Sequence, residues 1–286
     1  MSTVVSTITD VSPVAPNSRK PRIALVIQYI GMNFHGWQRQ PQLASIQGMI
    51  EAAITQEVGQ AVTLHGSGRT DTGVHAAAQV AHFDDPVGEI PGERWFKVIN
   101  RHLPPEILIR ASAPVPSDWH ARFSALWRRY RYSIYTDQWP NLFVERFSWH
   151  YYRATLCADT MQAALTTLLG KQHLAAFHRA GSNRTHSWVN VQKVSCCRQG
   201  PMLAIEIQAS GFLYGMVRLL VGLLVEVGSG KRTLDEFTEI WRNQRRDLVK
   251  YAAPAKGLCL LRVGYEHFPI PRHLWFDSQP FFAFAP

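Results

Sequence analysis

Apolar residues recur along the first 115 residues with two periods, one typical of strands and one typical of helices. Residues 23–29 form a continuous apolar run, which predicts a buried strand. Ser45 precedes apolar residues spaced by three and four, which predicts a capped helix over 46–58. We further predict strands at 62–65, 78–83 and 107–111, and a helix over 93–103 that two prolines end. This order is β-α-β-β-α-β, the ferredoxin-like split unit.

The second half of the chain repeats that order. Asp159 is expected to cap a helix that ends at Gly170, and residues 200–201 to form the turn of a hairpin. The remaining elements are strands at 127–135, 189–197, 203–209 and 258–265 and helices at 212–227 and 234–243. We therefore expect an α+β fold of two ferredoxin-like domains that share a central mixed or antiparallel sheet, with a cleft between the halves. The predicted divisions are an N-terminal tail (1–21), two subdomains (22–115 and 116–266) and a C-terminal tail (267–286).

Composition excludes disorder and indicates a polyanionic partner. Hydrophobic residues make up 46% of the chain and charged residues 18%. Lysine and arginine number 30 against 21 acidic residues, a net charge of +9, which favours nucleic acid before an anionic membrane. The most apolar stretch, 211–228, contains Arg218 and Glu226 and therefore predicts a buried helix and no membrane span. Four cysteines form no disulfide framework, so we expect a reducing compartment, the cytoplasm.

The densest chemical signal is the glycine-rich segment 66–76, which contains Arg69 and Asp71. Its glycines allow the backbone to approach a bulky ligand closely. Arg69 can pair either with Asp71, which would keep the carboxylate ionised, or with a phosphate. An ionised aspartate in a dry pocket can serve as base or nucleophile. The alternative from composition alone is an ordinary turn with a surface Asp–Arg pair, because both residue types are common in turns.

Phosphate-loop and metal chemistry find no support in the motifs. Segment 66–68 lacks the third glycine of a dinucleotide fingerprint, and 228–232 lacks the hydroxyl residue that follows lysine in a P-loop. The twelve histidines include no tight helical pair. The adjacent Cys196 and Cys197 point to opposite sides of a strand, and cysteines are best interpreted as small core residues. We predict no metal and no cofactor.

Basic and aromatic residues interleave at 120–124 and 128–132. On a strand, Tyr130 and Tyr132 share one face while Arg129 and Arg131 share the other. Such a strand can present an aromatic platform to a base, with Arg122 and Arg129 for phosphates, but it can equally be a core strand with one basic solvated face. Arg218 within an apolar helix either meets an internal acid, projects into a site or reaches solvent.

Together these segments resemble the bacterial tRNA pseudouridine synthase A family, in order from about residue 22 to 265. The matching segments are 29–31, 34–40, 45–47, 68–76, 120–125, 128–132, 212–218 and 253–258. The resemblance implies isomerisation of uridine to pseudouridine at positions 38, 39 and 40 of the tRNA anticodon stem-loop. It also implies catalysis without cofactor or metal, by a homodimer that holds one tRNA across both subunits.

The resemblance also implies roles for individual residues. Asp71 matches the family nucleophile, Arg69 the arginine beside it, and Arg218 the arginine that pairs with the catalytic carboxylate. Tyr130 matches the aromatic residue that stacks on the target base, and Leu258 an apolar residue of the pocket. Ile30 replaces the usual aspartate, and the departures within 178–188 leave the role of Arg184 open.

The chemistry of the reaction agrees with this set. Pseudouridine formation breaks an N-glycosidic bond and rejoins the turned uracil through carbon five, so water has to be kept out. Whether Asp71 attacks the ribose, attacks the base or removes the C2′ proton stays open at the level of sequence. A non-catalytic RNA-binding module would explain the charge and the aromatics but not the Arg69–Asp71 motif. An aspartate phosphohydrolase would need a second carboxylate near Asp71, and the sequence offers none.

Overall fold

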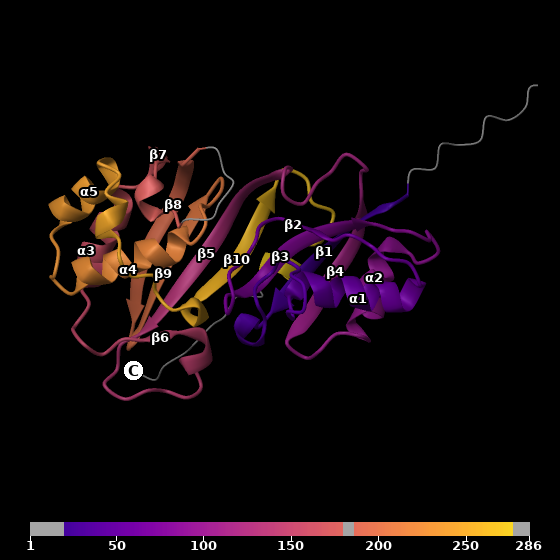
Figure 1. Cartoon of the computed structure of the whole chain (residues 1–286), viewed down its shortest axis with the longest axis horizontal. Coiled ribbons are helices and arrows are strands. Elements are labelled where there is room, and N and C mark those ends of the chain that lie inside the picture. Colours follow the sequence, from indigo (N-terminus) through magenta and orange to yellow (C-terminus); the bar gives the residue numbers. More distant parts are fainter. Residues whose placement is uncertain (1–19, 180–185, 277–286) are drawn as a thin grey trace, which may run out of the picture.

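The fold is built around one mixed sheet, seen in a computed structural model that describes residues 20–179 and 186–276. The sheet has ten strands in the order β4-β1-β3-β10-β5-β9-β8-β7, with β2 paired to β3 and β6 to β5 (Figure 1). The strands are β1 (Arg22–Tyr29), β2 (His65–Gly66), β3 (His75–Asp84), β4 (Ile107–Val115), β5 (Ala125–Tyr135), β6 (Trp149–His150), β7 (Gly170–His173), β8 (Trp188–Gln199), β9 (Met202–Ala209) and β10 (Leu258–Tyr265).

Each half of the sheet has the strand arrangement of a ferredoxin-like unit. The first half runs β4-β1-β3-β2 and the second β10-β5-β9-β8, so in each half the first strand lies between the fourth and the third. The last strand, β10, lies at the centre of the molecule (Figure 1), parallel to β3 and antiparallel to β5. The expected α+β fold with a central mixed sheet is therefore confirmed. The domain boundary at 115/116 stays a prediction.

The helices are α1 (Ile46–Val58), α2 (Trp95–Asn100), α3 (Ala158–Thr166), α4 (Met216–Gly228), α5 (Leu234–Arg242) and α6 (His273–Phe276). Ser45 caps α1 as predicted, because its Oγ accepts the amide hydrogen of Gly48 at 3.3 Å. The strongly apolar α4 is buried almost all round. Within the described ranges, no helix is long and apolar enough to cross a membrane.

Several predicted element ends were wrong for local reasons. The helix predicted from 212 begins at Met216, because Gly215 adopts a positive φ of 70° and breaks the helical path. Cys157, not Asp159, precedes α3, which ends at Thr166. Residues from Gly170 onward form β7, a strand that was not predicted. The helix predicted over 93–103 is a 3-10 turn followed by the short α2, and the strand predicted over 62–65 is only the two-residue β2.

The chain after β10 packs across the first half of the molecule. The Phe268 ring lies 6.0 Å from that of Trp119 and 5.6 Å from that of Trp275. Arg110 of β4 donates a hydrogen bond from Nε to the carbonyl of Leu274 at 2.9 Å. Ile270 and Trp275 belong to the core, so the described part of the predicted C-terminal tail is structural. Residues 277–286 and the predicted tail at 1–19 lie outside the described residues.

Candidate active site

Asp71 lies in the loop between β2 and β3, and the backbone of this loop is held on both sides. The side chain of Gln79, on β3, donates to the carbonyl of Gly68 at 2.9 Å. The hydroxyls of Tyr29 and Thr70 are hydrogen-bonded at 2.8 Å, and the amide of Trp37 donates to the carbonyl of Thr70 at 3.0 Å. The loop is therefore anchored immediately before its aspartate.

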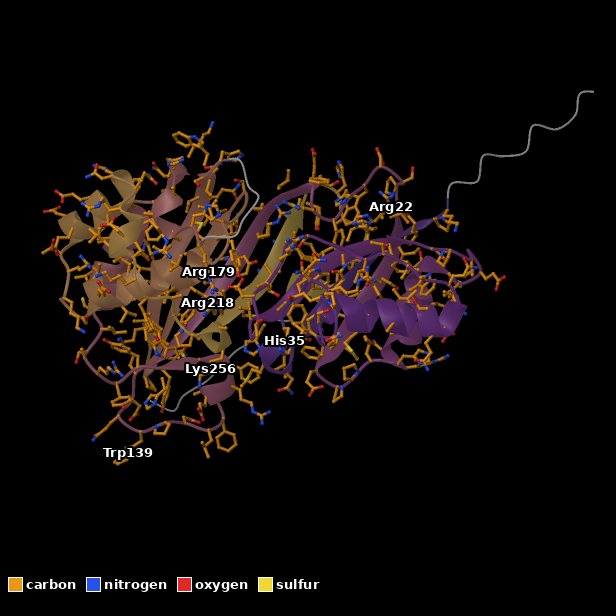
Figure 2. The ribbon with its side chains drawn as sticks, viewed as in Figure 1. Arg22, His35, Trp139, Arg179, Arg218 and Lys256 are labelled. Carbon is orange, nitrogen blue, oxygen red and sulfur yellow. The ribbon has the colours of Figure 1, made fainter. Side chains whose placement is uncertain are left out.

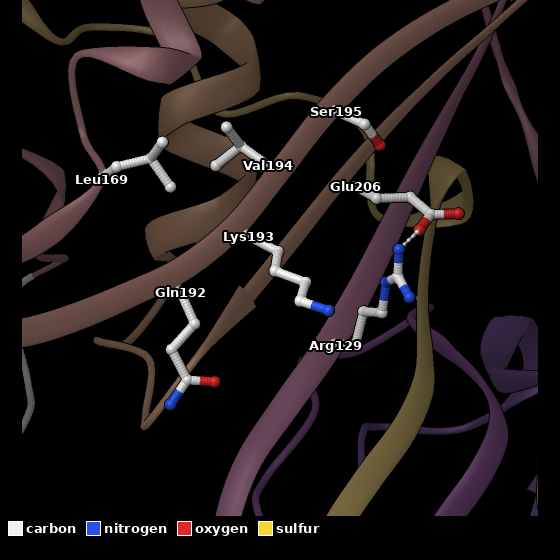
Figure 3. A pocket seen from close by; sticks show the side chains of 7 residues that line it. All are labelled: Arg129, Leu169, Gln192, Lys193, Val194, Ser195 and Glu206. Carbon is white, nitrogen blue, oxygen red and sulfur yellow. Dashed lines mark ion pairs between the residues drawn. The ribbon is translucent and has the colours of Figure 1, made fainter.

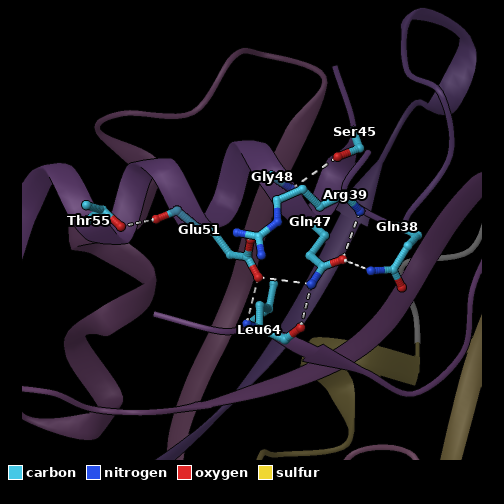
Figure 4. Close-up of polar contacts among 8 residues, drawn as sticks. All are labelled: Gln38, Arg39, Ser45, Gln47, Gly48, Glu51, Thr55 and Leu64. Carbon is cyan, nitrogen blue, oxygen red and sulfur yellow. Dashed lines mark hydrogen bonds and ion pairs between the residues drawn. The ribbon is translucent and has the colours of Figure 1, made fainter. Parts of the chain in front are cut away.

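The segment that contacts this loop is itself anchored to α1. A Cβ on Gly36, whose φ is +84°, would lie 2.6 Å from the carbonyl oxygen of Thr70, so only glycine fits. The Oε1 atom of Gln47 accepts hydrogen bonds from the Gln38 side chain at 2.8 Å and the Arg39 amide at 2.9 Å (Figure 4). The buried Glu51 forms an ion pair with Arg39 at 3.0 Å. Residues 36–39 thus form a support for the Asp71 loop.

Arg218 forms an ion pair with Asp71 across the junction of the two halves. Its Nη1 atom donates to Oδ2 of Asp71 at 3.1 Å. Arg218 lies in the first turn of α4, on the second half of the molecule at its side toward the first half (Figure 2). Its Nε donates to the carbonyl of Ala253 at 2.7 Å, and the Ala253 amide donates back to the Arg218 carbonyl at 2.9 Å. The predicted pairing of Arg218 with Asp71 is confirmed.

About four-fifths of each of these two side chains is shielded from solvent. The Asp71 side chain is 19% exposed and that of Arg218 18% exposed. Each ion therefore keeps limited contact with water while it is close to its partner. The guanidinium offers the carboxylate a charge-assisted hydrogen bond at this distance. The ion-paired carboxylate of Asp71 is therefore largely shielded from solvent.

Tyr130 and Leu258 lie on the sheet face that carries aromatic and aliphatic side chains. Tyr130 is directly opposite Leu260, and Leu258 is directly opposite Tyr132, on the antiparallel strands β5 and β10. Both Tyr130 and Leu258 are buried. The Phe212 ring meets that of Tyr130 edge to face at 4.8 Å. Burial raises the pKa of Tyr130, partly opposed by the positive charge of Arg128 and assisted by the nearby Asp71, so its hydroxyl stays protonated at neutral pH.

The arginines that the sequence analysis placed at the site lie on different surfaces of the molecule. Arg69 is exposed and forms no ion pair with Asp71 in the described part of the chain, so the structure does not show the first of its two predicted partners, and its role in the site stays a prediction. Arg122 is exposed in the turn before β5. Arg129 lies on the opposite face of β5 from Tyr130, where it forms an ion pair with Glu206 at 2.6 Å. Arg184 lies outside the described residues.

Arg129 lines a shallow hollow on the face of the sheet opposite Tyr130 (Figure 3). Its volume is about 310 Å³, and besides Arg129 and Glu206 it is lined by Leu169, Gln192, Lys193, Val194 and Ser195. Arg131 also binds Glu206, through Nε at 2.8 Å. This hollow is separated from Asp71 by the sheet, so it does not belong to the same site.

Two side chains near Asp71 have structural roles that the sequence did not reveal. Arg128 is buried and donates to the carbonyls of Ser67 and Arg122, at 2.8 and 2.7 Å, so it is an internal brace and no phosphate ligand. His75 accepts the Gly31 amide hydrogen through Nδ1 at 3.2 Å, and its Nε2 lies 3.2 Å from the Lys256 carbonyl. Burial lowers the pKa of His75, which keeps the ring neutral. The only sequence signal for either residue was its position in a segment that resembles the family, 128–132 for Arg128 and 68–76 for His75.

Nothing in the described part of the chain groups three His, Cys, Asp or Glu side chains into a site that could hold a metal ion. Cys196 is buried and Cys197 exposed, as predicted from their alternation on a strand. Burial raises the pKa of the Cys196 and Cys259 thiols to about 12, so both are protonated core residues. The candidate site therefore consists of Asp71, Arg218, Tyr130 and Leu258.

Comparison with known proteins gives one consistent result. A family model described as tRNA pseudouridine synthase matches residues 25–124 and 164–266. The chain is 71% identical over 271 residues to tRNA pseudouridine synthase A of Synechocystis sp., covering 95% of this chain and 98% of that protein. It is 68% identical to the protein of that name from Rippkaea orientalis (93% of this chain, 90% of the relative) and 64% identical to that from Nostoc sp. (92% and 93%).

Proposed function

The chain belongs to the tRNA pseudouridine synthase family and is an isomerase that converts uridine to pseudouridine in tRNA, and on this premise we propose that Asp71 is its catalytic carboxylate. We further propose that the target uridines are at positions 38, 39 and 40 of the anticodon stem-loop. The observation that carries the proposal is the ion pair between Asp71 and Arg218, since it places an ionised, sheltered carboxylate where the two halves meet.

The reaction rearranges one nucleotide and conserves its atoms. The bond between uracil N1 and ribose C1′ breaks, the bond between C5 and C1′ forms, and the hydrogen lost from C5 is balanced by one gained at N1. Water that reached the separated base and sugar would intercept them. A carboxylate that is ionised yet only 19% exposed suits this requirement, since it is reactive without being surrounded by solvent.

Arg218 fixes the orientation of the carboxylate. The hydrogen bond from Nη1 engages Oδ2 of Asp71, and the bond from Nε to Ala253 fixes the plane of the guanidinium. Because Arg218 is carried by α4 and Asp71 by the loop before β3, the pair also aligns the two halves of the molecule. Arginine suits this position, since its planar fork can hold two acceptors at fixed angles.

Tyr130 and Leu258 would hold the uracil after it leaves the helical stack. Extruding a base from a stem costs about a few kcal/mol, which stacking on an aromatic ring and contacts to phosphates offset. The buried Tyr130 ring, supported edge-on by Phe212, presents a rigid surface for stacking. Leu258 on the neighbouring strand extends the apolar wall. Such walls allow the uracil to turn between bond breaking and bond formation.

Arginines on both faces of the sheet would bind the phosphates of the tRNA. Arg69 and Arg122 are exposed on the side of the first half where the Asp71 loop begins. Arg129 lies on the opposite face, where phosphate contacts would serve a tRNA that extends over a second subunit. We therefore propose a homodimer that holds one tRNA across both subunits. A net charge of +9 supports such an extended contact.

Mapping pseudouridine in an unmodified tRNA transcript tests this function. The transcript is incubated with the enzyme in the presence of a chelator, and each uridine of the anticodon arm is then examined. We expect pseudouridine at positions 38, 39 and 40 and at no other uridine of the arm. Modification elsewhere would refute the proposed positions, and binding without any modification would favour a non-catalytic RNA-binding protein.

A further inference from the structure

A row of rings lies on the surface beside β2, where the Asp71 loop begins. Phe123 is 77% exposed, and the guanidinium of Arg122 lies 5.7 Å from the centre of its ring. The ring of His120 is 4.4 Å from that of Phe123, and the ring of the exposed His65 is 5.6 Å from that of His120. We call these four residues, His65, His120, Arg122 and Phe123, the Phe123 surface.

The turn that carries Phe123 is fixed by hydrogen bonds on both sides. The Nδ1 atom of His120 accepts the amide hydrogen of Arg122 at 3.0 Å. The buried His82 likewise accepts the Ala121 amide hydrogen at 3.2 Å, and the hydroxyl of Tyr265 donates to the Ala121 carbonyl at 2.7 Å. The exposed Phe123 ring is thus held by an ordered backbone, which reduces the entropy lost when a ligand stacks on it.

Arg128 connects the Phe123 surface directly to the Asp71 loop. Its Nη2 atom donates to the carbonyls of both Arg122 and Ser67, so these two carbonyl oxygens lie around a single nitrogen atom. His65 precedes Ser67 by two residues, and Asp71 follows it by four. A nucleotide strand that places a uridine at Asp71 therefore passes close to this surface.

The charge of the Phe123 surface favours RNA over a second protein chain. Arg122 is exposed there, and Arg69 is exposed on the loop that Arg128 joins to it. Asp84 interacts with His65 of this surface, but Arg22 neutralises it through an ion pair at 2.7 Å. An aromatic ring beside a guanidinium is suited to stacking on a base while binding the adjacent phosphate.

We propose that the Phe123 surface is a second RNA contact, on which an unpaired base of the substrate other than the target uridine stacks against Phe123 while Arg122 binds a neighbouring phosphate. This inference rests on the proposed function, because it takes tRNA as the ligand. It gives the enzyme two stacking positions, one at Tyr130 for the uridine that reacts and one at Phe123 for a base that does not. Occupation of the second would position the anticodon arm relative to Asp71.

Binding of a tRNA transcript to variants made in an Asp71→Asn background tests this contact. Phe123→Ala is expected to raise the dissociation constant about 5- to 150-fold, the range for loss of one stacked base. The matched control is Phe143→Ala, which removes an equally large ring that is 91% exposed in the loop between β5 and β6 and should leave affinity unchanged. Folding of each variant is checked by thermal denaturation.

The salt dependence of binding distinguishes stacking on Phe123 from phosphate binding by Arg122. The slope of log affinity against log salt should be unchanged in Phe123→Ala, because stacking releases no counterions. Arg122→Gln should make it shallower by about 0.7 for one lost phosphate contact on single-stranded RNA. Equal affinity of Phe123→Ala and Phe143→Ala would overturn the proposal, and so would loss of dimer mass in Phe123→Ala at unchanged RNA affinity. Failure of the proposed function is a separate outcome, namely absence of pseudouridine with the unaltered enzyme.

Discussion

The reactive centre contains an ion pair, between Asp71 and Arg218, that is largely shielded from solvent. Asp71 meets Arg218 at 3.1 Å, and both are about four-fifths shielded. The neighbouring Tyr130 stays neutral because its burial raises the pKa of the phenol. The site thus combines a carboxylate–guanidinium pair with a neutral aromatic wall. This separation of roles leads to distinct expectations for each side chain.

Replacing Tyr130 distinguishes its ring from its hydroxyl. Tyr130→Phe retains the ring and its edge-to-face contact with Phe212, so kcat/KM should stay within a few-fold of the unaltered enzyme. Tyr130→Ala should lose about 1–3 kcal/mol of stacking. Steady-state kinetics on a tRNA transcript measure both. Equal losses in the two variants would assign the role to the hydroxyl and contradict stacking.

His82 is expected to make folding sensitive to mild acid. Burial, followed by the charges of His120 and Arg22, lowers the pKa of its ring to about 3, whereas the unfolded chain binds this proton near pH 6.5. Its stabilising contribution is complete above pH 6.5 and is lost as the pH falls from 6.5 towards 3. Between pH 6.5 and 5.5 the loss should be about 1 kcal/mol. Urea denaturation of the unaltered protein and His82→Asn checks this, and equal pH dependence of the two would contradict it.

At the scale of elements, the site is assembled from segments that hold one another. The Asp71 loop contacts residues 36–37 on one side, and on the other a Cβ added to Gly73 of the loop would lie 3.2 Å from Cβ of Ala255. Arg128 extends from β5, two residues before Tyr130, to the carbonyl of Ser67 at the base of this loop. The distance between the stacking ring and the carboxylate is thus fixed partly by one buried guanidinium.

Removing the Arg128 guanidinium should lower kcat by more than the accompanying loss of stability accounts for. Arg128→Met leaves the carbonyls of Ser67, Arg122 and Ser210 without their donor, which should cost about 1–3 kcal/mol of stability and lower kcat at saturating tRNA. The control is Arg198→Met, since Arg198 bridges Thr136 and the Leu156 carbonyl far from the loop in sequence. Its loss should lower stability but not kcat. Similar effects of both variants on kcat would contradict a positioning role for Arg128.

Sequence periodicity was sufficient for the elements that bury a regular face, such as α1 and β5. It failed where one residue or a distant partner determines the path, as at Gly215, which delays the start of α4. The Asp71–Arg218 pair was predicted through the family resemblance, because 147 residues separate the two and no local pattern joins them. The opposite roles of Arg128 and Arg129 were not predictable, since the loops that bury Arg128 come from elsewhere in the chain.

At the scale of the whole molecule, basic groups are spread over both faces of the sheet. Arg122 lies on the surface that Arg128 connects to the Asp71 loop, whereas Arg129 and Arg131 share Glu206 on the opposite face. The sheet separates the latter pair from the Asp71 of their own chain. If they bind RNA, the nucleic acid has to extend beyond one active site. This arrangement agrees with the proposed homodimer that holds one tRNA across both subunits.

Mixing two inactive variants tests whether subunits share a tRNA. One carries Asp71→Asn, and the other carries Arg129→Gln together with Arg131→Gln. In the mixed dimer one active site retains its aspartate and faces a partner with intact arginines, so partial activity should return. Subunit exchange is verified by differently tagged chains. A mixture that stays inactive after proven exchange would mean that each subunit binds its tRNA alone.

The central claim is that Asp71 performs the chemistry from a site whose folding does not require it. The most direct measurement compares Asp71→Asn with the unaltered enzyme for tRNA affinity, thermal stability and pseudouridine formed at positions 38–40. The substitution keeps the size of the side chain and a hydrogen-bond acceptor for Arg218 but removes the negative charge. We predict affinity within a few-fold of the unaltered enzyme, a folded protein and no pseudouridine. Measurable turnover by Asp71→Asn would contradict the assignment of Asp71 as the catalytic carboxylate.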